Sequence, residues 1–99
     1  MPQGGGGQVR NPEWKGRLET QPEALEDLRT WVSEDRKIAL KILKLIEAAR
    51  RSPFEGAGKP EPLRHLGPDI WSRRITQADR VVYRVLSDGI DVLQARYHY

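Results

Sequence analysis

Apolar residues in the first half of the chain recur at helical spacing. Leu25, Leu28 and Val32 stand at positions i, i+3 and i+7 with charged residues between them, which predicts an amphipathic helix ending near Val32. Thr20 is placed to cap this helix, with Glu23 as its capping-box partner. We therefore expect the three apolar side chains to face the core.

A second amphipathic helix is predicted over residues 35–50. Residues 33–35 break the first pattern and offer a new N-cap. One face of the following segment is apolar and consists of Ile38, Ile42, Leu45, Ile46 and Ala49. Because the link between the two helices is short, we expect them to form an antiparallel hairpin.

The second half of the chain has strand-like patterns after a loop. Proline and glycine recur over about 17 residues after Arg51 and predict a long loop without regular structure. β-Branched and aromatic runs predict strands at 70–75, 80–86 and 90–99, with a hairpin turn at 87–89. The expected fold is α+β, with two helices packed on a small twisted antiparallel sheet, which a strand near residues 14–19 would extend.

The composition is that of one small domain. The chain has 99 residues and no cysteine, which excludes a disulfide framework, a thiolate metal site and a cysteine nucleophile. It has no apolar leader and no uninterrupted apolar run of membrane-spanning length, so we expect a soluble cytoplasmic protein. Residues 1–13 include four consecutive glycines and predict a flexible tail, which leaves residues 14–99 as the domain.

The net charge of +3 originates in the second half of the chain. Residues 1–49 contain eight basic and eight acidic side chains, whereas residues 50–99 contain nine basic and six acidic ones. All but one of these nine are arginines, whose planar guanidinium suits phosphate groups. A polyanionic partner is therefore the leading hypothesis, and an ordinary solvated basic surface is the alternative.

Four residues of this half carry side chains suited to acid–base chemistry: Glu61, Arg80, His98 and Tyr99. Two prolines flank Glu61 and keep its backbone extended, and histidine is the usual proton carrier near neutral pH. Taken singly, the glutamate and the histidine are also what an ordinary protein surface contains. Walker, HExxH, CxxC and GxSxG motifs are absent, and we expect neither a metal nor a cofactor.

A carboxylate, an imidazole, arginines and aromatic rings are the groups that metal-independent RNA cleavage requires. The carboxylate would accept the proton of the 2′-OH, and the arginines would stabilise the charge that grows on the phosphorane. The imidazolium would protonate the departing 5′-oxygen, while aromatic rings would stack the bases and align the reacting atoms. The composition of the second half is compatible with this chemistry.

Four ordered motifs point to one protein family. They read RSPFEGAGKPEPL at 51–63, WSRRI at 71–75, RVVY at 80–83 and ARYHY at 95–99. Together they closely resemble the YoeB-type toxins, the Txe/YoeB branch of the RelE superfamily, from about Arg17 to the last residue. Members usually begin with an apolar first strand, whereas residues 17–20 here are polar and follow a glycine-rich leader.

The resemblance implies roles for individual residues. Glu61 corresponds to the general base and His98 to the general acid, Arg80 would stabilise the phosphate, and Tyr99 would orient and stack the RNA. Further RNA contacts are implied for Arg64 and Arg74, and more weakly for Lys59 and Arg73.

The resemblance also implies a fold, an activity and partners. The fold would be the RelE/YoeB-like microbial ribonuclease fold, and the activity would be cleavage of mRNA in the ribosomal A site by a bacterial toxin. A YefM-like antitoxin would neutralise the toxin, in a homodimer or a toxin–antitoxin hetero-oligomer that reaches operator DNA only through the antitoxin. The alternatives are a toxin that binds its target without cutting it, and a catalytically decayed toxin that acts as a corepressor.

Overall fold

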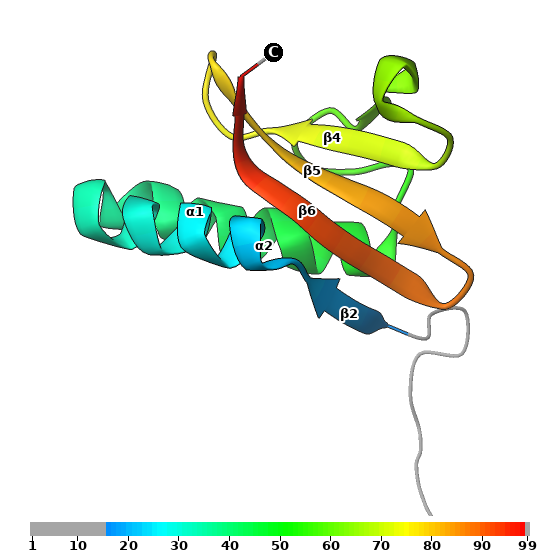
Figure 1. Ribbon diagram of the computed structural model, residues 1–99, viewed down its shortest axis with the longest axis horizontal. Helices are drawn as coiled ribbons and strands as arrows, with labels where there is room; N and C mark the ends of the chain where they lie inside the picture. The colour runs from blue at the N-terminus through cyan, green and yellow to red at the C-terminus, as the bar shows by residue number, and fades with distance from the viewer. Residues whose placement is uncertain (1–15, 99) are drawn as a thin grey trace, which may run out of the picture.

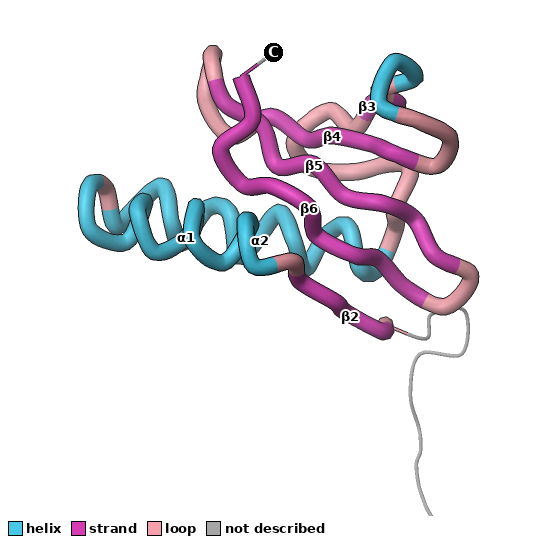
Figure 2. The backbone as a smooth tube through the Cα atoms, viewed as in Figure 1, coloured by secondary structure: helices cyan, strands magenta, loops and turns pink. Residues whose placement is uncertain are grey.

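The computed structural model describes residues 16–98, and the predicted tail at residues 1–13 lies outside them. Two helices pack against a five-stranded sheet with the strand order β2-β6-β5-β4-β3 (Figures 1 and 2). The elements are β2 (Arg17–Thr20), α1 (Pro22–Glu34), α2 (Arg36–Arg51), β3 (Glu61–Pro62), the 3₁₀ turn η1 (Arg64–Leu66), β4 (Ile70–Arg74), β5 (Asp79–Leu86) and β6 (Gly89–His98). The predicted α+β class is confirmed.

The sheet is mixed rather than purely antiparallel, because β2 runs parallel to β6. A tight hairpin forces its two strands to be antiparallel, but β2 enters the helices rather than a hairpin and is free to pair in either direction. The polar segment therefore forms the expected first strand through backbone pairing at an edge. Gly89 allows this close approach, since a Cβ atom there would lie 1.9 Å from the carbonyl oxygen of Arg17.

Helix α1 begins differently from the prediction. Thr20 pairs with Val92 in the parallel ladder, and Gln21 is the N-cap residue, without a side-chain hydrogen bond to the helix. The predicted capping box is therefore wrong, because the residue expected to cap the helix is part of a strand. Pro22 begins the helix, at a position where the missing N–H costs no hydrogen bond.

The buried side of α1 also differs from the prediction. Leu25 is 52% exposed and Val32 is 56% exposed, whereas Ala24 and Trp31 are buried and Leu28 is partly buried against the core. The apolar spacing gave the correct period but the wrong orientation. The helix is rotated so that Trp31 reaches the sheet, where its Nε1 donates a hydrogen bond to the carbonyl of Ala95 at 2.9 Å.

Helix α2 matches its prediction closely. The Asp35 carboxylate accepts a hydrogen bond from the Ile38 backbone N–H at 3.3 Å and so caps the helix. Ile42, Leu45 and Ala49 are buried, and the flanking isoleucines are partly buried against the same core. This helix therefore contributes more buried apolar side chains to the core than α1 does.

The far end of β6 is held by α1. The pairing of β5 with β6 shifts register between Arg80 and Tyr83. At this irregularity the backbone N–H of Ala95 donates a 3.0 Å hydrogen bond to the Asp27 carboxylate. The backbone carbonyl of the same residue accepts the hydrogen bond from Trp31 described above. The guanidinium carbon of the next residue, Arg96, lies over the Trp31 ring, 4.5 Å from the ring centroid. Both backbone groups of the displaced residue are thus satisfied, and the last residues of the strand are anchored.

The loop after α2 contains more regular structure than predicted. Leu63 is 2% exposed and packs with Ile70 and Val82 on the sheet face away from the helices. Burial of this one leucine, together with a 2.8 Å hydrogen bond from its N–H to the carbonyl of Ile70, holds the short strand β3 and the turn η1 against β4. A second, smaller core therefore covers part of the face that the helices leave open.

No helix among residues 16–98 combines the length and the apolar character needed to cross a membrane.

Candidate active site

Glu61 and Arg80 meet on the sheet face opposite the helices. Glu61 pairs with Ser72 of β4, and Arg74, two residues further along, pairs with Arg80 of β5. Alternate residues of a strand share a face, so the side chains of these four residues lie on one side of the sheet. Glu61 Oε2 is 4.0 Å from Arg80 Nη1, with the arginine side chain 7% exposed and the glutamate side chain 37% exposed. A nearly buried cation thus lies beside an accessible carboxylate.

His98 occupies the end of β6, opposite Asp79. Its Nε2 lies 3.4 Å from Asp79 Oδ1, and its side chain is 71% exposed. The ladder partner of Arg80 is Tyr97, so strand alternation places His98 on the other side of the sheet from Arg80. The structure therefore brings Glu61 and Arg80 together but leaves His98 paired with Asp79, and Tyr99 lies outside the described residues.

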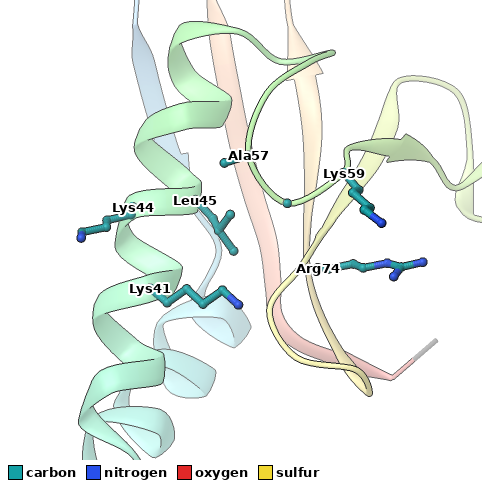
Figure 3. A pocket seen from close by; sticks show the side chains of 7 residues that line it. Lys41, Lys44, Leu45, Ala57, Lys59 and Arg74 are labelled. Atoms are coloured by element: carbon teal, nitrogen blue, oxygen red, sulfur yellow. The ribbon is translucent and has the colours of Figure 1, made fainter.

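Three of the predicted RNA-contacting cations are exposed near this face: Lys59, Arg64 and Arg74. Figure 3 shows the side chains of Lys59 and Arg74 extending in the same direction, away from α2. Beside them is an open pocket of about 420 Å³ between α2, the loop and the end of β4. Its lining residues are Lys41, Lys44, Leu45, Ala57, Gly58, Lys59 and Arg74. Exposed positive charge therefore gathers where the loop before Glu61 meets the end of β4.

Arg73 is not part of this basic surface. Its exposed fraction is 0%, and its guanidinium donates hydrogen bonds to the carbonyls of Ser52, Glu55 and Ala57 and to the hydroxyl of Tyr83. Alternation along β4 places it on the helix side, whereas Arg74 is exposed on the other. The implied RNA contact of Arg73 is therefore incompatible with its position, because no atom of it is accessible to a strand of RNA.

Within residues 16–98, no three histidine, aspartate or glutamate side chains are grouped so that they could hold a metal ion.

Comparison with known proteins decides the family. Residues 20–99 match the family model described as a YoeB-like toxin of bacterial type II toxin–antitoxin systems. The toxin YoeB of Escherichia coli K12 is 48% identical over 77 residues, which cover 78% of this chain and 92% of that protein. The chain belongs to the YoeB-like toxin family.

Solved structures of YoeB toxins have the same fold. A YoeB dimer from Staphylococcus aureus matches with a TM-score of 0.77 at 34% identity, over 86% of this chain and 99% of that one. A YoeB–YefM complex from the same organism matches with a TM-score of 0.73 at 34% identity, over 84% and 97% of the two chains. The resemblance drawn from the four sequence motifs is confirmed, as is the two-helix and sheet architecture.

Two side chains beside the candidate residues of this YoeB-like toxin were not singled out from the sequence: Asp79, whose Oδ1 lies 3.4 Å from His98 Nε2, and Tyr83, which contacts Arg73. Tyr97, one of the two aromatic residues that flank His98 in the sequence, shares a 3.1 Å hydrogen bond with His65 Nε2 next to Arg80. Their positions depend on strand register. Leu86 pairs with Gly89 at the hairpin turn, and a hairpin of regular pairing would therefore place Asp79 opposite Arg96. The observed register shifts move Asp79 two residues along β6, so that it pairs with His98.

The Tyr83 hydroxyl gives this YoeB-like toxin a pH-dependent contribution to stability. Burial raises the pKa of Tyr83 above 10.0, an effect that the hydrogen bond from Arg73 opposes in part. A folded-state pKa above the unfolded value means that the folded protein holds this proton more tightly. The contribution is therefore fully present below pH 10 and is lost as the pH rises through the folded-state pKa.

We expect Tyr83→Phe to lose less stability than the wild type between pH 9.5 and 11.5, because phenylalanine has no proton to release. Urea unfolding at a series of pH values measures the free energy of unfolding of each protein. Both proteins contain the same lysines, so lysine titration does not contribute to the difference between them. Parallel stability curves for the two proteins over this range would contradict the assignment.

Proposed function

We propose that this YoeB-like toxin is a ribosome-dependent mRNA endoribonuclease that cuts mRNA in the ribosomal A site and so stops translation. The observation that supports it most directly is the pairing of an accessible carboxylate, Glu61, with the nearly buried Arg80, next to the exposed cations Lys59, Arg64 and Arg74. A surface of this kind suits a polyanionic substrate and places acid–base chemistry beside fixed positive charge. Family membership supports the toxin role.

In the proposed reaction the carboxylate of Glu61 takes the proton from a ribose 2′-OH, and the freed oxygen attacks the adjacent phosphorus. Arg80, assisted by Arg74, stabilises the negative charge that grows on the phosphorane oxygens. The bond to the 5′-oxygen breaks, and His98 gives that oxygen its proton, which leaves a 2′,3′-cyclic phosphate and a 5′-hydroxyl. Tyr99 would stack on a base and help to align the attacking oxygen, phosphorus and leaving oxygen.

The position of His98 requires one change before it can serve as the acid. Its imidazole is paired with Asp79, on the far side of the strand from Arg80. Because it lies at the end of β6 and is largely exposed, it can turn around the strand end toward the scissile phosphate when RNA occupies the basic face. Asp79 then acts as the resting partner of the imidazole.

The proposed partners follow from the family and the charge. A cognate YefM-like antitoxin would neutralise the toxin by covering its basic face with an acidic segment, and operator DNA would be reached only through that antitoxin. Homodimers are a second proposed assembly. We place the working protein in the bacterial cytoplasm, where ribosomes and mRNA meet.

Primer extension on an mRNA tests the proposed activity. The purified chain is incubated with naked mRNA, with mRNA in a reconstituted bacterial translation system, and in that system as the His98→Gln variant. We expect cuts only on translating ribosomes, and their loss in the variant. Equal cutting of naked RNA would contradict ribosome dependence, and full activity of the variant would contradict the role of His98.

A folded variant that lacks both Glu61 and His98 separates catalysis from plain binding. We expect the double substitution Glu61→Gln and His98→Gln to remove translation inhibition in the same system. Full inhibition without any cut would instead establish a toxin that blocks its target, and inactivity of the wild type in every setting would leave a decayed toxin that serves its antitoxin as corepressor.

A further inference from the structure

Arg73 is a fully buried cation whose partners are neutral. In the described part of the chain, each of its hydrogen bonds goes to an uncharged oxygen. Nη1 donates to the Ala57 carbonyl at 2.9 Å, Nη2 to the carbonyls of Ser52 and Glu55, and Nε to the Tyr83 hydroxyl at 3.1 Å. Burial of a charge is costly unless its hydrogen bonds are satisfied, so the loop carbonyls and the guanidinium depend on one another.

Tyr83 completes this contact from the neighbouring strand. Its hydroxyl accepts from Arg73 and donates to the carbonyl of Pro53 at 2.5 Å, and its ring lies 5.7 Å from the guanidinium carbon. Four carbonyls between Ser52 and Ala57 are thus held by two side chains of the sheet. We call this group of contacts the Arg73–Tyr83 clasp.

The clasped loop leads directly to Glu61. Three consecutive residues of β4 hold the chain between α2 and β3: the Arg73 side chain binds the loop carbonyls, the Arg74 N–H donates to the Gly58 carbonyl at 2.7 Å, and Ser72 pairs with Glu61. Lys59, between the last two contacts, has a φ of 52°. The path from the clasp to the carboxylate is therefore short and contains an uncommon backbone conformation.

Close packing shows how tightly the loop follows this path. A Cβ atom on Gly58, whose φ is 86°, would lie 2.9 Å from Arg73 Cβ and 2.8 Å from Leu45 Cδ2. Figure 3 shows the loop passing between α2 and β4, with Leu45 directed toward it. The loop has no room to approach the sheet more closely, so its distance from β4 is determined by the contacts already described.

We propose that Arg73 and Tyr83 are positioning residues for the ribonuclease reaction, which hold the loop so that Glu61 lies at its working distance from Arg80. This inference rests on the proposed function, because it assigns a supporting role to residues that never touch RNA. Misplacement of a catalytic group by about 1 Å can lower a rate by about 100-fold. Loss of the clasp therefore acts on the chemical step rather than on RNA binding.

The test compares Tyr83→Phe in two backgrounds, wild type and Glu61→Gln, by single-turnover cleavage on ribosomes with excess protein. In the wild-type background we expect kcat to fall by about 10–100-fold with little change in KM. In the Glu61→Gln background the same substitution should lower the residual rate less than about threefold, since the group that it positions is already inactive. A purely structural tyrosine would lower both rates by the same factor.

Ile90→Val is the matched control for stability. Ile90 is fully buried at the opposite end of β6, far along the strand from Arg80 and its partner Tyr97. This variant loses core packing but keeps the clasp, and we expect its cleavage rate to stay within about twofold of the wild type. Equal rate losses in Ile90→Val and Tyr83→Phe would overturn the proposal, as would unchanged kcat in Tyr83→Phe.

Amide hydrogen exchange tests the clasp separately from the activity. The Arg74 N–H, which donates to Gly58, should exchange at least about tenfold faster in Tyr83→Phe than in Ile90→Val, while the Ile42 amide in α2 exchanges equally in both. If the wild type fails to cut mRNA on ribosomes, the proposed function fails, and this measurement alone then shows whether the Arg73–Tyr83 clasp holds the loop on β4. Equal exchange of the Arg74 amide in the two variants would show that the clasp does not hold the loop.

Discussion

Replacing Glu61 with glutamine is expected to lower the rate of ribosome-dependent mRNA cleavage by about 10²–10⁴-fold, the usual contribution of a general base. Glutamine has the same shape as glutamate but cannot accept the 2′-OH proton. The glutamate side chain is 37% exposed, and its contact with Arg80 is long at 4.0 Å. We therefore expect the free energy of unfolding to change by less than about 1 kcal/mol.

Glu55→Gln provides the matched control for this prediction. Glu55 is an exposed glutamate of the same loop, and its backbone carbonyl, not its carboxylate, binds Arg73. The same chemical change six positions earlier should leave the cleavage rate within about twofold of the wild type, because that carboxylate is outside the candidate site. Single-turnover rates measured for both variants decide the matter. A Glu61→Gln protein that cuts at the wild-type rate would remove Glu61 from the mechanism.

Replacing Arg73 with methionine is expected to lower the free energy of unfolding by about 3–5 kcal/mol. The substitution removes all of the hydrogen bonds that the guanidinium donates and leaves the carbonyls of Ser52, Glu55 and Ala57 without this partner. A buried charge can be replaced by an apolar side chain at no cost when its partners are replaced too. Here the partners are backbone carbonyls, which no side-chain substitution removes.

Arg74→Met is the natural control, because it makes the same change at the next residue. Arg74 is exposed, and its backbone N–H, which binds Gly58, is retained in the variant. Urea unfolding of both variants should show a change within about 0.5 kcal/mol for Arg74→Met. Similar losses in the two proteins would contradict the view that burial, rather than charge alone, makes Arg73 important.

Local sequence patterns were sufficient for both helices and for the three long strands, but not for β3 and η1. The apolar face of α2, its Asp35 cap and the hairpin turn before Gly89 all depend on residues close together in the chain, and each is present as predicted. Glu61 and Arg80 were selected by residue type and by resemblance to a family. The family is confirmed, and the catalytic roles remain predictions.

Side-chain burial depended on contacts that no local pattern contains. Alternation places Arg73 and Arg74 on opposite faces of β4, but only the packing of the loop against β4 makes the first buried and leaves the second exposed. The orientation of α1 was decided in the same way, by the bond from Trp31 to Ala95, which lies 64 positions away in the chain.

The sequence alone determined the class of fold, the two helices, the hairpin of β5 and β6 and the family, because these depend on short-range periodicity and on ordered motifs. The tertiary structure alone decided the parallel pairing of β2, the rotation of α1, the register shifts that place Asp79 opposite His98, and the burial of Arg73. Each of these is a choice between arrangements that satisfy local propensity equally well. The choice depends on how segments distant in the chain satisfy one another's backbone hydrogen bonds.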